Sequence, residues 1–487
     1  MTDTRSRERM RWLTSFVAAP AVAALMLALG PPDGLAREAW IVAVLTLFMA
    51  TWWITEIVPI PVTALLPVVV LPVAGVGSPG EITAPYANPL VFLFLGGFII
   101  ALAIQKWGLH RRIALLLLHY SGQRPDHVVG GFMAGSAGLS MWVSNTATAA
   151  MMLPIGLSVL AVMEGAREGQ DPASRRGFSL ALLLGIAFGA NIGGMGTLIG
   201  TPPNAILAGF MSDTYGIQIG FGQWMMVGFP VSLVLLVACW WVLTRWAFAV
   251  DRRPAAGIRD IIHERRTELG ALSRSERRVL LVFVATALAW MFRPLLEAIT
   301  GAAISDAGIA VTAAVLLFLI PAAGPRRGAL LDWNSTRELP WGVIILIGGG
   351  LSLGSAIEAS GLAGAVAQQL AALGAWPLFV VVAAVVGLTM LLSHVASNTA
   401  TAATLMPVVT SVALSIDQPP LILAVAVALA ASCAFMLPVA TPPNAIIFGS
   451  ERLRVADMAQ AGWRVTTVAI PLVLVGSLII TPWLLLR

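Results

Sequence analysis

Charged residues are scarce in this chain. Only 11% of its 487 residues are Asp, Glu, Lys or Arg, whereas 58% are hydrophobic and the mean hydropathy is +0.88. A soluble domain usually carries about 25% charged residues, so this chain lacks the polar surface that a globule in water needs. The long, unbroken apolar runs therefore predict an all-α polytopic membrane protein.

Cysteine is almost absent as well. The two cysteines, Cys239 and Cys433, both lie in apolar runs, and their spacing matches no disulfide or metal motif. We expect buried thiols and no resident cofactor. The basic segment 1–13 is not followed by a clear small-residue cleavage site, so we expect the first apolar stretch to be retained as a span.

Apolar stretches of the length that a bilayer requires predict about eleven transmembrane helices. They lie at 14–30, 38–55, 57–76, 88–105, 179–209, 224–250, 277–296, 305–322, 340–357, 421–449 and 464–486. Two further apolar stretches, 128–163 and 378–414, each carry a polar string near the centre. We expect these two stretches to be re-entrant hairpins rather than spans.

The loops carry the basic residues on one side of this topology. If the N-terminus is cytoplasmic, 26 of the 29 Lys and Arg residues fall in cytoplasmic segments, and only Arg37, Arg293 and Arg487 fall outside. This asymmetry follows the positive-inside rule and puts the C-terminus outside. The net charge of +5 thus indicates orientation rather than a nucleic-acid partner. The pattern of segment 106–122 predicts an amphipathic helix at the inner interface or an extension of the fourth span.

Two motifs occur twice. The string "SNTATAAMMLP" (144–154) returns as "SNTATAATLMP" (397–407), 253 positions later, and "GTPPNAI" (200–206) returns as "ATPPNAI" (440–446), 240 positions later. Five predicted spans separate the two Ser-Asn-Thr strings, and an odd number of spans inverts the second copy. Inverted-topology repeats are typical of secondary transporters.

The repeated motifs predict interruptions in the membrane helices. "TPPN" cannot continue a helix, because proline removes a backbone donor and clashes with the preceding turn, and the Gly-rich run 189–200 should loosen the backbone before it. A break frees carbonyl groups that suit a small cation and N–H groups that suit an anion. The Ser-Asn-Thr strings should form hairpin tips whose hydroxyl and amide groups can bind both a cation and an anion.

The hairpin tips and breaks contain no Lys, Arg, Asp or Glu. A bound anion must then be compensated by helix dipoles and by bound cations. Because this region has no carboxylate to carry a proton, Na⁺ coupling is favoured over H⁺ coupling. The alternative for each motif alone is simple packing or a hydroxyl bond to a backbone carbonyl, but two paired copies favour a ligand site.

These motifs, together with 92–115 and 56–76, closely resemble the divalent anion/sodium symporter family, which includes the INDY-type dicarboxylate and citrate transporters. The resemblance extends from about residue 38 to the end. It implies an eleven-span fold with two hairpins in the ion-transporter superfamily. It also implies a homodimer in which a transport domain moves against a scaffold by an elevator motion.

The resemblance divides the chain into six parts. They are a cytoplasmic tail (1–13), scaffold helices (14–87), repeat one (88–223), spans 6–8 with the cytoplasmic loop 251–276 (224–339), repeat two (340–463) and the last span (464–487).

The resemblance also assigns site residues. It implies that substrate contacts Ser144, Asn145, Thr146, Thr201, Pro202, Ser397, Asn398, Thr399, Thr441 and Pro442. It implies one Na⁺ at Ser140, Ser144, Asn145 and the Gly200 carbonyl, and another at Ser393, Ala396, Asn398 and the Ala440 carbonyl.

One position departs from the family pattern. His394 precedes the second Ser-Asn-Thr string where a Thr-Glu pair is common, and it is either satisfied by a nearby carbonyl or pH-sensitive. We expect a Na⁺-coupled importer of di- or tricarboxylates in a plasma (inner) membrane. The alternatives are an anion exchanger or sulfate transporter, possibly proton-coupled, and, remotely, an intramembrane enzyme. No nucleophile–base pair or metal cluster supports an enzyme.

Overall fold

The computed structural model describes residues 2–119, 122–165, 172–253, 258–323, 328–370 and 376–485. This part of the chain is almost entirely helical, with one isolated β-bridge between Pro321 and Ala329. The all-α prediction is confirmed.

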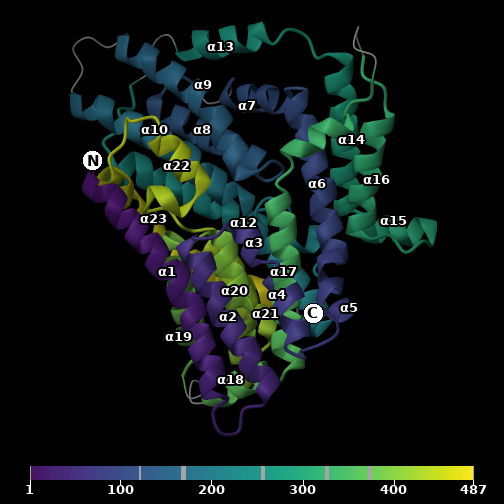
Figure 1. Cartoon of the computed structure of the whole chain (residues 1–487). Helices are drawn as coiled ribbons and strands as arrows, with labels where there is room; N and C mark the ends of the chain where they lie inside the picture. The colour runs from purple at the N-terminus through teal and green to yellow at the C-terminus, as the bar shows by residue number, and fades with distance from the viewer. Residues whose placement is uncertain are drawn as a thin grey trace.

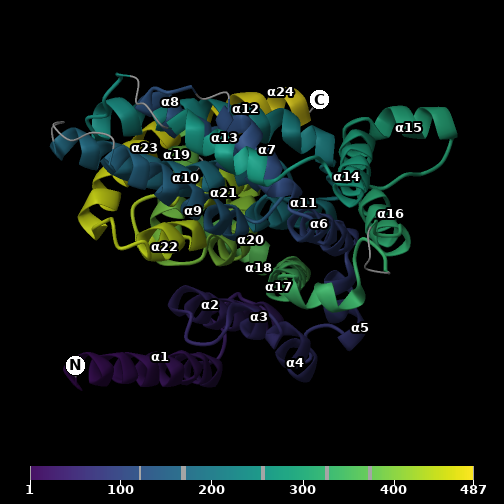
Figure 2. The same cartoon turned by 90° about the horizontal axis from the view of Figure 1, so that it is seen from above.

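The first helices form a layer on one side of the molecule (Figure 2). The layer contains α1 (Thr2–Leu29), α2 (Arg37–Thr55), α3 (Ile60–Thr63), α4 (Leu66–Val73), α5 (Pro79–Thr83) and the 3₁₀ turn η1 (Ala84–Ala87). The third predicted span is not one helix, because Pro61 and Pro67 each fall in the first turn of a new helix, where proline is tolerated.

Repeat one begins with a continuous span. Its helices are α6 (Pro89–Lys106), α7 (Leu109–His119), α8 (Pro125–Ser140), α9 (Asn145–Gly165), α10 (Pro172–Gly194) and α11 (Pro202–Tyr215). The predicted amphipathic segment forms a separate helix, α7, which buries Leu109, Leu115 and Leu118 on one face. The hairpin is α8–α9, and the fifth span is broken between α10 and α11.

The middle of the chain forms α12 (Phe221–Trp241), the π-helical η2 (Val242–Ala247), α13 (Ile258–Glu268), α14 (Arg274–Met291), α15 (Arg293–Thr300), α16 (Asp306–Leu319) and η3 (Trp333–Glu338). The seventh predicted span bends by 82° between α14 and α15. Pro294 stands in the first turn of α15, so the bend follows from a proline that starts a new helix.

Repeat two reproduces the order of repeat one. It contains α17 (Trp341–Ala359), α18 (Leu362–Leu370), α19 (Leu378–Val395), α20 (Asn398–Ser415), α21 (Pro420–Ala431), η5 (Pro438–Ala440) and α22 (Pro442–Phe448). The chain then continues through α23 (Val455–Val475), the π-helical η6 (Gly476–Ile480) and α24 (Thr481–Leu485).

The two repeats are inverted relative to each other. In Figure 1 the hairpin α8–α9 lies in the upper half of the molecule and α19–α20 in the lower half, while α10 and α22 lie above α21. α22 packs against both α9 and α10. The broken spans and hairpins of the two copies therefore meet near the middle.

Each of the eleven predicted spans has an apolar helix or helix pair. Within the described residues, seven helices are long and apolar enough to cross a membrane, or eight if α14–α15 counts as one. One of the seven is the hairpin arm α19, and four predicted spans contain shorter apolar helices. The hairpin arms have 16 to 21 residues, which corresponds to roughly 24 to 32 Å at 1.5 Å per residue.

The Gly-rich run before the first break serves close packing. α10 remains helical through Gly194, and residues 195–200 are not helical, so the expected loosening holds for the second half of the run and not for the first. A Cβ atom at Gly189 would lie 2.9 Å from the Met133 carbonyl oxygen, and one at Gly193 would overlap the backbone of Ala137. Glycine at every fourth position thus lets α10 contact α8 backbone to backbone, as small residues do in membrane helix pairs.

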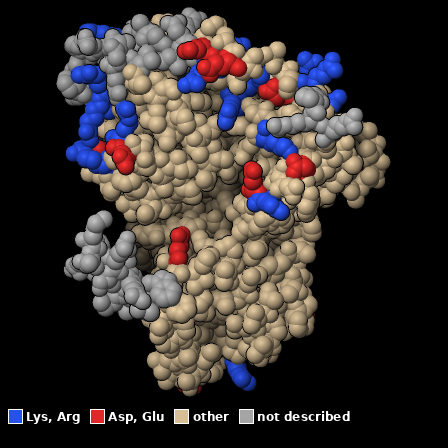
Figure 3. Space-filling view, turned by 45° about the horizontal axis from the view of Figure 1, so that its top comes forward, with Lys and Arg blue, Asp and Glu red and all other residues tan. Residues whose placement is uncertain are grey.

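Basic side chains gather at one end of the molecule. Figure 3 shows Lys and Arg over its upper part, few charges over its lower part, and a hollow near the middle of this face. Both cysteines are buried, as predicted. The charge distribution agrees with the loop pattern in the sequence.

A buried ion cluster at the basic end holds the first hairpin to α12. The Asp126 side chain is fully buried, and its Oδ2 lies 2.8 Å from both Arg124 and Arg245. Its backbone carbonyl accepts a bond from Trp240. We expect Asp126→Ala to lower the free energy of unfolding by about 1–3 kcal/mol, because two partly exposed arginines lose their partner. Thermal unfolding in detergent measures the change.

The matched control is the exposed ion pair Arg265–Glu268. Because exposed pairs contribute roughly 0–1 kcal/mol, Glu268→Ala should leave the melting temperature almost unchanged. Equal shifts for the two variants would contradict a structural role of the buried cluster.

Candidate functional site

The two hairpin tips share one internal hydrogen bond. In the first hairpin the Ser140 hydroxyl donates to Asn145 Oδ1, five residues later. In the second, the Ser393 hydroxyl donates to Asn398 Oδ1 at 2.7 Å. Each asparagine is the first residue of the helix after the turn. The repeated string thus encodes one local geometry, in which a buried serine orients the amide at the tip.

The asparagine of each "TPPN" motif satisfies the backbone at the break. Asn204 Nδ2 donates to the carbonyls of Gly194 at 3.2 Å and Thr197 at 2.7 Å. Asn444 Nδ2 donates to the carbonyls of Ala434 and Leu437, both at 3.1 Å. Unpaired carbonyls are costly away from water, so these amides make an unwound segment tolerable. This role was not predicted from the sequence.

The helix starts α11 and α22 offer fewer N–H donors than we expect from the breaks. Two prolines, which have no N–H group, occupy the first turn of each helix, and the Asn204 N–H is bonded to the Thr201 carbonyl. The contribution of these N–H groups to anion binding therefore stays a prediction.

Backbone donors remain at the hairpin tips. Within the part of the chain that the structure describes, the N–H groups of Asn145, Thr146, Asn398 and Thr399 make no hydrogen bond. They stand at the positive ends of α9 and α20, where a helix attracts an anion.

The tips and breaks surround one cavity of about 780 Å³. Its walls include all ten residues predicted to contact substrate, namely Ser144, Asn145, Thr146, Thr201, Pro202, Ser397, Asn398, Thr399, Thr441 and Pro442. Gly200 and Ala440 also line it, whereas Ser140, Ser393 and Ala396 are buried behind the wall. Residues 253 positions apart thus face the same space.

No lysine or arginine is among the described residues that line this cavity, but two glutamates are. Glu56 follows α2 and Glu338 ends η3, and both are exposed. Gln105, near the end of α6, also lines the cavity. Sequence reasoning missed these three because they lie outside the repeated motifs.

Two of the four ligands expected for the first cation lie beside Gly194. A Cβ atom built at Gly194 would lie 2.7 Å from Asn145 Oδ1 and 3.0 Å from the Gly200 carbonyl oxygen. The two oxygens therefore face one small space that only the hydrogen of a glycine leaves open. Neutral side-chain oxygens and carbonyls of unwound backbone are the groups that hold Na⁺ in transporters of this kind.

On the second side, Ser393 connects the hairpin to the broken span. Its single hydroxyl hydrogen is shared between two acceptors, the Ala431 carbonyl at 2.6 Å and Asn398 Oδ1 at 2.7 Å. The neighbouring His394 is buried, with Nδ1 2.5 Å from the Met390 carbonyl. Nδ1 of His394 thus has a carbonyl partner, whereas its buried Nε2 has none among the described residues.

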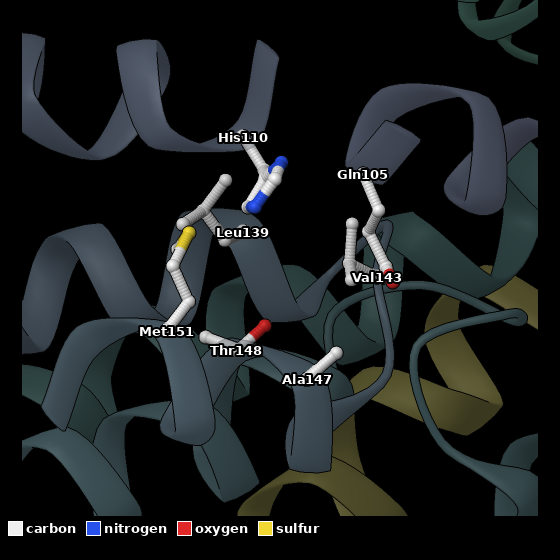
Figure 4. Close-up of a pocket in the computed structure, with 7 residues that line it drawn as sticks. All are labelled: Gln105, His110, Leu139, Val143, Ala147, Thr148 and Met151. Carbon is white, nitrogen blue, oxygen red and sulfur yellow. The ribbon is translucent and has the colours of Figure 1, made fainter. Parts of the chain in front are cut away.

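A second, smaller cavity of about 40 Å³ lies behind the first hairpin tip. Figure 4 shows His110 and Gln105 on one side of it and Thr148 on the other. The Thr148 hydroxyl is buried and has no partner among the described residues, and the space is large enough for water. Burial lowers the pKa of His110, although its bond to the Ile104 carbonyl acts in the opposite direction.

Comparison with solved structures identifies the fold. The *Alcanivorax borkumensis* YdaH transporter superposes with a TM-score of 0.60 at 14% identity, covering 91% of this chain and 99% of that one. *Neisseria gonorrhoeae* MtrF, described as one of a class of antimetabolite efflux pumps, superposes with a TM-score of 0.57 at 12% identity, covering 94% and 98%. Both show that this chain has the same fold as these two proteins.

Comparison of sequences identifies the family. The chain is 40% identical over 474 residues to the sodium-dependent dicarboxylate transporter SdcS of *Staphylococcus saprophyticus*, covering 96% of this chain and 91% of the relative. It is 39% identical to SdcS of a bovine *Staphylococcus aureus* strain, covering 94% and 89%. Residues 10–486 match the model of the sodium:sulfate symporter transmembrane region. The chain therefore belongs to the sodium:sulfate symporter family of multi-pass membrane transporters.

Proposed function

We propose that this protein is a Na⁺-coupled importer of dicarboxylates. One observation carries the proposal: the polar residues of two inverted repeats line a single cavity whose described walls contain no basic side chain. An anion there depends on hydrogen-bond donors, helix dipoles and accompanying cations. The dicarboxylate specificity of the SdcS relatives supports the substrate class.

The anion contacts come from both hairpin tips. The free N–H groups of Thr146 and Thr399, the hydroxyls of Ser144 and Ser397, and the residues Thr201–Pro202 and Thr441–Pro442 would bind the two carboxylates. Two tips that line one cavity could each bind one carboxylate of a dicarboxylate.

The cations are held by oxygens next to these contacts. One Na⁺ would lie between Ser140, Ser144, Asn145 and the Gly200 carbonyl, and the other between Ser393, Ala396, Asn398 and the Ala440 carbonyl. Asn145 and Asn398 thus serve both ligands: the amide oxygen faces the cation and the N–H groups face the anion. This shared use would couple the two bindings.

The transport cycle would be an elevator motion in a homodimer within the plasma membrane. The two hairpins, the broken spans α10–α11 and α21–α22, and α12 and α23 would move against a scaffold made of the remaining spans. The basic end would face the cytoplasm, with the N-terminus inside and the C-terminus outside. Because Glu56, Gln105 and Glu338 come from the ends of elements toward the basic end, the conformation would be the inward-facing one.

Uptake of labelled succinate into proteoliposomes tests the function. With Na⁺ outside and K⁺ inside, we expect uptake at least about tenfold faster than with K⁺ on both sides, because the anion has no fixed positive partner. Empty liposomes provide the background. Equal uptake in the two buffers would contradict Na⁺ coupling.

Sulfate is the second candidate, and the description of the family model favours it. Excess unlabelled sulfate, citrate, malate or succinate should compete with the labelled substrate in proportion to affinity. Counterflow in Na⁺-free buffer identifies an exchanger, and dependence on a pH gradient identifies proton coupling.

A further inference from the structure

Asn191 connects the two repeats at the wall of the cavity, and no motif includes it. This asparagine of α10 is fully buried and lines the cavity. Its Nδ2 lies 3.0 Å from Thr441 Oγ1 and 3.3 Å from Asn444 Oδ1. A residue of the first broken span is thereby tied to the "TPPN" motif of the second.

The network determines which atom of each amide faces which neighbour. Asn444 must direct Nδ2 to the carbonyls of Ala434 and Leu437, because a carbonyl can only accept. Asn444 Oδ1 is then the acceptor that faces Asn191. Asn191 must in turn present Nδ2, and so it is a donor toward Thr441.

The Thr441 hydroxyl can form a further hydrogen bond only as a donor. A hydroxyl has one O–H donor and two acceptor positions. Thr441 Oγ1 accepts one bond from Asn191 and a second from the Asn444 N–H at 3.3 Å. Both acceptor positions are occupied, so the hydroxyl hydrogen is what this side chain can offer to a molecule in the cavity.

The equivalent threonine of repeat one is different. Thr201 makes no side-chain capping bond, and the position equivalent to Asn191 in repeat two, 240 residues later, is Ala431. The Thr201 hydroxyl can therefore either donate or accept. The pseudo-two-fold symmetry of the cavity is therefore broken between Thr441, which has Asn191 as a partner, and Thr201, which has no equivalent asparagine.

We propose that Asn191 is a positioning residue for substrate specificity: it makes the Thr441 hydroxyl a fixed hydrogen-bond donor aimed at a substrate carboxylate. A carboxylate only accepts, so this wall favours an anionic oxygen and disfavours a donor group or a cation at Thr441. The proposal rests on the dicarboxylate transport proposed above.

The test is the KM for succinate of purified protein in proteoliposomes, at saturating Na⁺. Asn191→Leu, which removes the donor at similar volume, should raise KM about threefold to tenfold with maximal rate and Na⁺ dependence nearly unchanged. In a Thr441→Val background the same substitution should change KM by less than about twofold. In a Thr201→Val background, the matched control, its full effect should remain.

Equal effects of Asn191→Leu in the Thr441→Val and Thr201→Val backgrounds would overturn the proposal. If Asn191→Leu does not fold, Asn191→Ser replaces it, because the shorter side chain loses the same contact. A double-mutant cycle on the melting temperature without substrate tests the contact between Asn191 and Thr441 separately. If the shifts of the two single variants add up to the shift of the double variant, the proposal is also overturned. Wild-type protein that takes up no dicarboxylate would instead defeat the proposed function.

Discussion

Gly194→Ala should weaken the Na⁺ dependence of uptake by shifting it to higher Na⁺ concentrations. The added methyl group would lie 2.7 Å from Asn145 Oδ1 and 3.0 Å from the Gly200 carbonyl oxygen, and so it would fill the space that these two oxygens face. The amide of Asn145 would have to move away, which also disturbs its bond with Ser140. We expect the Na⁺ concentration for half-maximal uptake to rise at least about tenfold, equivalent to about 1.4 kcal/mol.

Gly387→Ala is the matched control. Gly387 lies in the hairpin arm α19, and a Cβ atom there would meet nothing within 4 Å, so the variant should transport like the wild type. Both variants should be compared in amount and melting temperature before uptake is measured. Wild-type Na⁺ dependence in Gly194→Ala would contradict the assignment of the first cation site to this space.

Asn145→Ala and Asn398→Ala should each lower uptake by roughly a hundredfold or more. Each asparagine serves a cation and the anion in the proposed site, and a hydrogen bond to a charged group contributes roughly 1.5–3 kcal/mol, so the loss of two such contacts exceeds two orders of magnitude. The partner serine, Ser140 or Ser393, also loses its acceptor. Labelled succinate uptake at saturating Na⁺ measures the loss.

The two variants should fail in similar ways because the two tips have the same local geometry. Thr410→Val, in the same helix as Asn398, provides a control, since the Thr410 hydroxyl bonds to the Met406 and Pro407 carbonyls of α20 and does not line the cavity. Near-normal transport by either asparagine variant would contradict the role of its hairpin tip.

The motifs made much of the site predictable. Polar groups are costly in an apolar sequence, so a string of hydroxyl and amide side chains that occurs twice indicates a binding site. All ten residues expected to contact substrate line one cavity. Double prolines similarly predicted the two breaks, because no continuous helix accommodates them.

Other features could not be read from the repeats. Asn191 lies within the Gly-rich run, but the equivalent residue of repeat two is Ala431. A search for residues shared by the two repeats therefore does not find Asn191. Glu56, Gln105 and Glu338 reach the cavity from other elements. The glycines of α10 were expected to weaken a helix, whereas their neighbours in α8 show that they permit contact. Each case depends on a partner that is distant in sequence.

By itself, the sequence determined the membrane environment, the helical class, the inverted duplication and the positions of the breaks, because each follows from hydropathy, charge or proline chemistry along a local stretch of chain. The tertiary structure alone decided which freed carbonyls are already occupied, which N–H groups stay open, and that Thr441 can only donate. Hydrogen-bond capacity is used up by neighbours in space, and those neighbours become known only when the two repeats are packed together.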